Sequence, residues 1–163
     1  MGRIAAIAAL AALPGGCATV AVAPPAEDCA VLAAAIEAAA PEVRAQGDRI
    51  AFPRRLSAST YGRPFADEAD GVRPGARIDL RACPGLPERI GAAGWTLVER
   101  PFAPRRAGQT MADHFSRIAV AGDARVVTLY LAEGEGVDVF LRRAEAAGWR
   151  ADEADYWLVI NAD

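Results

Sequence analysis

The stretch Arg125-Val-Val-Thr-Leu-Tyr-Leu131 decides how the chain is expected to fold. Every second side chain from Val127 to Leu131 is apolar, a period of two that is typical of a strand with one face in a core. Turn residues stand on both sides of it, at Gly122-Asp123 and at Glu133-Gly-Glu-Gly136. We therefore predict that this stretch is a strand of an antiparallel β-meander.

The neighbouring segments extend the same pattern. His114–Val120 is expected to be extended, Val137–Arg142 alternates, and Tyr156–Asn161 is predicted to be the closing strand. The segment 137–143 leaves an alternative open, because its apolar residues also fit a helical stripe that ends at Gly148. Strand is the preferred prediction for it.

The first half of the chain adds helices. Asp28–Ala40 is rich in alanine, can be capped by Asp28 and is followed by Pro41, which predicts a helix. Leu86–Ala93 is expected to be a short helix that Gly94 ends. Extended segments are predicted at Arg49–Leu56, Ile78–Cys83 and Trp95–Glu99. The expected fold is α+β, a single domain at 28–163 with the N-terminal helix packed on the antiparallel meander.

A targeting segment is expected before this domain. Arg3 is followed by ten apolar residues, 4–13, too few to cross a bilayer as a helix but typical of the centre of a secretion signal. Residues 1–16 are therefore predicted to be a signal peptide. Residues 17–27, uncharged over most of their length and containing Pro24-Pro25, are predicted to be a flexible tether.

The order Leu13-Pro-Gly-Gly-Cys17 resembles a bacterial lipobox, with Pro14 where the usual residue is leucine. The resemblance implies that Cys17 receives lipid and becomes the first residue of the mature chain. Ala18, which is not aspartate, implies the outer membrane by analogy with Gram-negative lipoproteins. Ordinary cleavage shortly after Cys17, giving a soluble periplasmic or secreted protein, and an uncleaved anchor are the alternatives.

The number of cysteines agrees with export. The chain has 3 cysteines, so an even pair, Cys29 and Cys83, remains if Cys17 carries lipid. Export permits oxidation, and we predict a disulfide between Cys29 and Cys83. Two separate buried thiols are the alternative.

The C-terminal half resembles that of small uncharacterised bacterial exported proteins and lipoproteins. The matching order is Phe115-Ser-Arg-Ile118, Val126–Leu131, Phe140-Leu-Arg-Arg143, Gly148-Trp-Arg150 and Trp157-Leu-Val-Ile160. The resemblance implies consecutive strands, including one at 137–143. It implies no activity.

The sequence carries few residues that point to catalysis or to metal binding. The tetrapeptide Asp-Glu-Ala-Asp occurs at 67–70 and 152–155 and is expected to form acidic turns, because a chain without lysine lacks a phosphate-binding loop. A single histidine and the absence of a Cys-x-x-Cys pair argue against a metal site, and no cofactor is expected. His114, between Asp113 and Ser116, is a weak catalytic candidate, since sequence neighbours do not establish a triad.

Two hypotheses follow. The first is a membrane-tethered periplasmic lipoprotein that acts as a non-catalytic binding or envelope component, held to the membrane by its N-terminal lipid. Its further partner would be an envelope protein or a small ligand, and its net charge of −3 argues against nucleic acid. The second is a small envelope hydrolase that uses His114. The aromatic residues at 95, 149, 156 and 157 are expected to pack in the core, with a small binding groove as the functional alternative.

Overall fold

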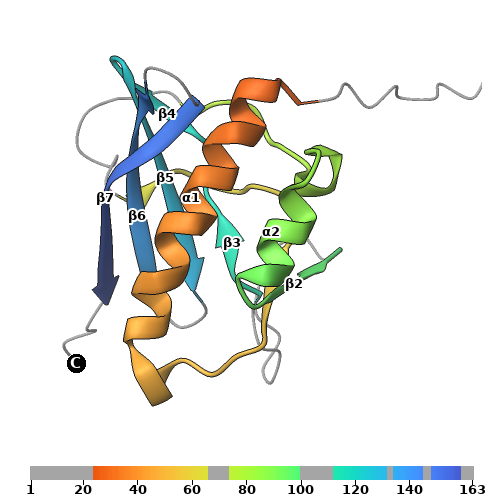
Figure 1. Cartoon of the computed structure of the whole chain (residues 1–163), viewed down its shortest axis with the longest axis vertical. Helices are drawn as coiled ribbons and strands as arrows, with labels where there is room; N and C mark the ends of the chain where they lie inside the picture. Colours follow the sequence, from red (N-terminus) through yellow and green to blue (C-terminus); the bar gives the residue numbers. More distant parts are fainter. Residues whose placement is uncertain (1–23, 66–73, 100–111, 132–133, 145–147, 159–163) are drawn as a thin grey trace, which may run out of the picture.

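The computed structural model describes residues 24–65, 74–99, 112–131, 134–144 and 148–158. A long N-terminal helix packs on an antiparallel sheet, which confirms the predicted α+β fold (Figure 1). The helices are α1 (Ala26–Ala45) and α2 (Leu86–Ala92), with 3-10 turns η1 (Gly47–Arg49) and η3 (Leu80–Ala82). The strands are β1 (Arg54–Ser57), β2 (Trp95–Val98), β3 (His114–Phe115), β4 (Ala119–Ala121), β5 (Ala124–Leu131), β6 (Glu135–Ala144) and β7 (Gly148–Leu158).

The main sheet is the predicted meander. The strands β4, β5, β6 and β7 pair antiparallel in chain order. Strand β3 also pairs antiparallel with β5, on the same edge as β4 and opposite β6. The stretch Arg125–Leu131 lies in β5, which opposes β6 with Val127 across from Val139. The strand prediction for 137–143 is confirmed by β6, which begins two residues earlier and takes Glu135 and Gly136 from the expected turn.

One face of this sheet and one side of α1 form the core. The strand residues on this face share an exposure of 5% or less and are Val127, Leu129, Leu131, Val137, Val139 and Leu141. The helix contributes Cys29, Val31, Leu32, Ala35, Ile36, Ala39, Ala40 and Val43. Several of these are alanines, whose small side chains let the helix lie close to the strands. Burial of this apolar surface is the main stabilising contribution.

The helix α1 begins two residues before the expected start at 28 and continues past Pro41 to Ala45, so the expected end at Ala40 is wrong. Proline removes one hydrogen-bond donor and disfavours a helix interior. Val43 lies on the turn that follows and is 0% exposed, packed in the same core as Ile36. This burial is the physical reason that the helix extends beyond the proline.

A second, smaller sheet lies beside the first. The strands β1 and β2 pair parallel, with Leu56 across from Leu97, and α2 precedes β2. The segment Arg49–Leu56 is thus strand only from Arg54 onward, since Arg49 belongs to η1.

The predicted disulfide is confirmed. Cys29 in the first turn of α1 and Cys83 just after η3 are bonded, with their Cα atoms 5.3 Å apart and a sequence separation of 54. Both cysteines are buried, at 8% and 1% exposure. The bridge therefore links α1 to the segment that leads into α2.

The predicted strand at Ile78–Cys83 is wrong. Asp79 makes only an isolated bridge to Ser59, and its side chain accepts a hydrogen bond from the backbone N–H of Arg81 at 3.0 Å. An aspartate that bonds its own backbone competes with a strand ladder. Residues Leu80–Ala82 accordingly form the turn η3.

The last strand also differs from its prediction. Strand β7 begins at Gly148 rather than Tyr156, and residues 159–161 of the predicted strand lie outside the described residues. A register shift places Glu153 opposite Phe140 and Ala151 opposite Leu141, so Asp152 is a bulge. The extra residue interrupts the alternation of side chains along β7, so the sequence of its first half does not show the period of two that predicts a strand.

Candidate functional site

His114 and Asp113 point to different sides of the chain. The Asp113 carboxylate accepts two hydrogen bonds from Arg54, each of 2.6 Å, and one from the indole N–H of Trp95 at 2.7 Å. Asp113 is 2% exposed, so this ion pair is buried. Successive residues of an extended chain face opposite sides, and His114 therefore lies on the other face of the sheet.

The serine nearest to His114 in sequence is bonded to the backbone. The Ser116 hydroxyl donates to the carbonyl of Arg117 at 2.9 Å and accepts from the N–H of Thr128 at 2.9 Å. Ser116 is also fully buried, at 0% exposure. In the described residues this hydroxyl serves to hold the backbone of β5 beside residues 116 and 117.

Aromatic rings surround His114 instead. Its imidazole is stacked on Tyr130, with ring centroids 4.9 Å apart and planes at 14°, and Tyr61 meets it edge-on at 6.1 Å. Burial lowers the pKa of His114, while Asp113 and a hydrogen bond with the backbone of Ala112 act in the opposite direction. The lowered pKa favours the neutral form of the imidazole.

His114 belongs to a line of rings that crosses the sheet, here called the aromatic row: Tyr61, Phe65, His114, Tyr130 and Trp157. The register places His114 opposite Tyr130, Tyr130 opposite Gly136, and Gly136 opposite Trp157. Tyr130 meets Trp157 edge-on at 5.8 Å, and Phe65 stacks on Trp157 at 4.2 Å.

Gly136 makes the row continuous. A Cβ atom at this position would collide with the indole ring of Trp157. Only glycine leaves the backbone of β6 open for a ring from the neighbouring strand to lie over it. The Trp157 indole therefore lies over Gly136 of β6 and reaches the Tyr130 ring of β5.

The segment 61–65 is attached to the sheet by its backbone. The N–H of Tyr61 donates to the carbonyl of Phe115 at 2.7 Å, and the N–H of Phe65 donates to the Thr128 hydroxyl at 2.7 Å. The Tyr130 hydroxyl donates to the carbonyl of Arg63 at 2.6 Å. These contacts hold the outermost rings of the row in place.

Two rings of the aromatic row remain open to solvent. Tyr61 is 46% exposed and Phe65 is 40% exposed, whereas apolar side chains on the α1 face are buried. Exposed rings fixed by backbone hydrogen bonds are suited to contact with a partner, because little side-chain freedom is lost on binding. The row is the best candidate binding surface in the described residues.

The aromatic residues considered from sequence lie in different places. Trp95 is 2% exposed and packs edge-on against Phe52 at 5.1 Å, and Tyr156 lies against the core. Trp149 also packs against the core and lies beneath two arginines, and only Trp157 joins the aromatic row. The sequence patterns did not point to Tyr61, Phe65 or Tyr130. A usable signal was present, because Tyr130 and Gly136 flank a turn and are therefore expected to lie opposite each other on neighbouring strands.

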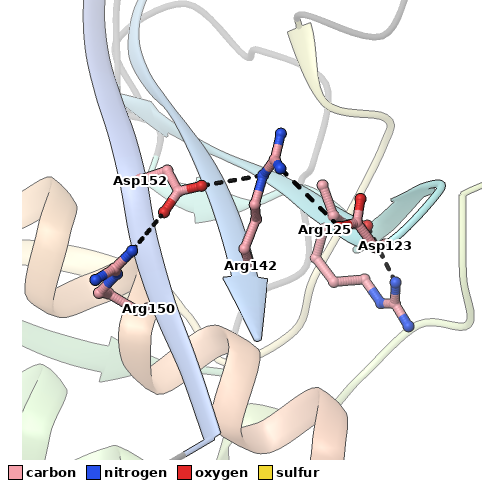
Figure 2. Close-up of polar contacts among 6 residues, drawn as sticks. Asp123, Arg125, Arg142, Arg150 and Asp152 are labelled. Carbon is pink, nitrogen blue, oxygen red and sulfur yellow. Dashed lines mark hydrogen bonds and ion pairs between the residues drawn. The ribbon is translucent and has the colours of Figure 1, made fainter. Parts of the chain in front are cut away.

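The opposite end of the sheet carries an ionic network (Figure 2). Asp152, the bulge residue of β7, lies 3.0 Å from Arg142 and 3.2 Å from Arg150, and Arg142 also lies 4.0 Å from Asp123. These arginines are 61% and 75% exposed, so each pair contributes about 1 kcal/mol or less.

A second ionic group joins this end to α1. Glu27, in the first turn of α1, accepts from Arg125 at 3.1 Å and from Arg143 at 3.0 Å. Both guanidinium groups also lie over the Trp149 ring, at 4.9 Å and 5.6 Å from its centroid. The start of α1 is thereby fixed to the end of the sheet opposite the aromatic row.

The acidic tetrapeptides do not behave alike. Residues 152–155 lie within β7, so the prediction of an acidic turn is wrong there, and 67–70 lie outside the described residues. Among the residues that the structure describes, no group of three or more His, Cys, Asp or Glu side chains is arranged to hold a metal ion. No helix in the described part of the chain is long and apolar enough to cross a membrane.

Comparison of the chain with protein-family models, with curated proteins and with solved structures finds no match.

Proposed function

We propose that this protein is a lipoprotein of the bacterial outer membrane whose domain faces the periplasm and acts as a non-catalytic binding component. The Cys29–Cys83 disulfide is the observation that carries this proposal. Disulfides persist in oxidising compartments such as the periplasm and are rare in the cytosol. The bridge uses two of the 3 cysteines and leaves Cys17, in the lipobox-like stretch, as the residue for the lipid.

The attachment point of the tether and the aromatic row lie at opposite ends of the domain, which supports a binding role. The tether leads into α1 at Ala26, beside the start of β5, as the contact between Glu27 and Arg125 shows. Strands β5 and β7 run from this end toward the far end of α1 (Figure 1). Tyr130 and Trp157 lie near their far ends, so a lipid at Cys17 would attach the domain at the end opposite the aromatic row.

Replacing Cys17 with alanine tests the tether. We expect the wild-type chain to be found in the membrane fraction and to carry a lipid-sized increment in intact mass. Each CH2 group of an acyl chain that is buried in the bilayer contributes about 0.8 kcal/mol to the free energy of membrane binding, which holds the lipidated protein there. The Cys17→Ala chain should lack this increment and leave the membrane fraction.

The matched control is Pro14→Leu, which brings the stretch closer to the usual lipobox and should preserve or increase lipidation. A wild-type protein found in the cytoplasm with Met1 intact, or membrane attachment unchanged in Cys17→Ala, would contradict the proposal.

Photocrosslinking tests the binding surface. A photoreactive amino acid in place of Tyr61, in the full chain in cells, is expected to form a discrete adduct, because this ring is exposed and held by backbone contacts. The same amino acid in place of Glu37, whose side chain is 57% exposed on α1, is the control. Equal adducts at both positions, or none at Tyr61, would argue against the aromatic row as the binding surface.

A further inference from the structure

A cavity lies where α1 begins, at the end of the domain opposite the aromatic row. Its volume is about 280 Å³, and its walls come from the start of α1, the segment 75–78, residues near β4 and the start of β5. The N–H of Gly75 donates to the carbonyl of Ile118 at 2.8 Å, which holds two of these walls together. The cavity is thus formed by backbone elements that are fixed to one another.

The floor of the cavity is apolar. Ile78 and Ile118 line it and are 3% and 4% exposed. Val120, also part of the lining, is 49% exposed and marks the open side. Such a surface accepts an alkyl or aryl group, because transfer of apolar area from water is favourable.

The charged groups around the cavity are not equally neutralised. Arg125 lines the cavity but donates to Glu27 at 3.1 Å and to the carbonyl of Ala124 at 3.0 Å. Glu27 is thereby neutralised, with Arg143 as its second partner. Asp28, the other acid in the lining, has no hydrogen bond or ion pair within the described residues.

The environment of Asp28 agrees with this description. Burial raises the pKa of Asp28, the neighbouring Glu27 raises it further, and Arg125 lowers it by a smaller amount. A carboxylate in such surroundings is stabilised by any cation that reaches it.

We propose that this cavity binds a small organic cation, a primary ammonium group on a short apolar body. The ammonium would pair with Asp28, and the apolar body would lie on Ile78 and Ile118. The cavity is near the lower limit of typical ligand sites, about 300 Å³, which restricts the ligand to a few carbon atoms. The Asp28 carboxylate disfavours an anion, because the Arg125 guanidinium in the lining is already paired with Glu27. This inference is independent of whether Cys17 carries lipid.

Titration with n-butylamine, followed by NMR on the full chain in nonionic detergent, tests this site. The amide signals of residues 28, 78 and 118 are expected to shift and saturate. The neutral probe 1-butanol, similar in shape, should bind at least about fivefold more weakly, since it lacks the charge that pairs with Asp28. Butanol binding as tightly as butylamine, or shifts that do not saturate, would overturn the proposal.

Two variants place the interaction at the cavity. Asp28→Asn should weaken butylamine binding at least about fivefold, and Val120→Arg, which brings a competing cation to the rim without altering α1, should weaken it similarly. Glu37→Gln, on the same helix and outside the cavity, is the matched control and should bind like the wild type. Thermal unfolding of each variant verifies that it is folded, and unchanged binding in a folded Asp28→Asn would overturn the proposal.

Discussion

Asp113→Asn is expected to lower the free energy of unfolding by about 3 kcal/mol, because it leaves the Arg54 guanidinium without its buried counter-charge. The wild-type carboxylate accepts from Arg54 and from Trp95, and Arg54 is itself only 17% exposed. The backbone of Asp113 also bonds to β1, through Arg55 and Ser57. The side chain and backbone of one residue therefore connect the parallel pair β1–β2 to the main sheet.

Urea unfolding followed by circular dichroism measures this effect. The matched control is Glu37→Gln, which breaks the ion pair between Glu37 and Arg89, whose side chains are 57% and 54% exposed. That variant should lose about 1 kcal/mol or less, because exposed pairs are hydrated and weak. Equal losses in the two variants would mean that the buried pair contributes nothing beyond a surface salt bridge.

Removing the disulfide has the second large expected effect. The double variant Cys29→Ala/Cys83→Ala is expected to lose about 2–5 kcal/mol of unfolding free energy. The bridge closes a long loop, with a sequence separation of 54, and so restricts the unfolded chain. Alanine is preferred to serine here because both sites are buried and a hydroxyl would need a partner.

Urea unfolding with and without a reductant provides the check. Reduction should shift the wild-type transition toward that of the double variant, and the double variant itself should be insensitive to the reductant. A wild-type transition that does not respond to complete reduction would show that the bridge does not stabilise the domain.

Local pattern explains most of what was predictable. The alternation from Val127 to Leu131 predicted a strand because the period of two reflects burial of one face, which a short segment reports by itself. The helix was predicted by its alanine-rich composition, which is also a local property, but the expected cap at Asp28 is wrong, because the N-cap residue is Pro25. Gly122-Asp123 was predicted as a turn and connects β4 to β5.

Where prediction failed, distant contacts outweighed local preference. The turn of α1 after Pro41 persists because Val43 is buried in the core. The bulge residue Asp152 forms ion pairs with Arg142 on β6 and Arg150 on β7. The same holds for the candidate site. His114 was found from sequence as a lone histidine, but its ring partners Tyr61 and Tyr130 come from segments far apart in the chain.

The sequence alone therefore determined the α+β class and the alternating strand at 125–131, and it favoured the pairing of Cys29 with Cys83 over two separate thiols. The first two follow from composition and residue spacing, and the pairing was expected from the number of cysteines together with the lipobox-like stretch, without knowledge of the neighbours in space. Only the tertiary structure decided that Asp113 faces Arg54 while His114 faces Tyr130, and that Gly136 admits the Trp157 ring. The physical reason is that strand register and side-chain burial are set by contacts between segments that local sequence does not encode.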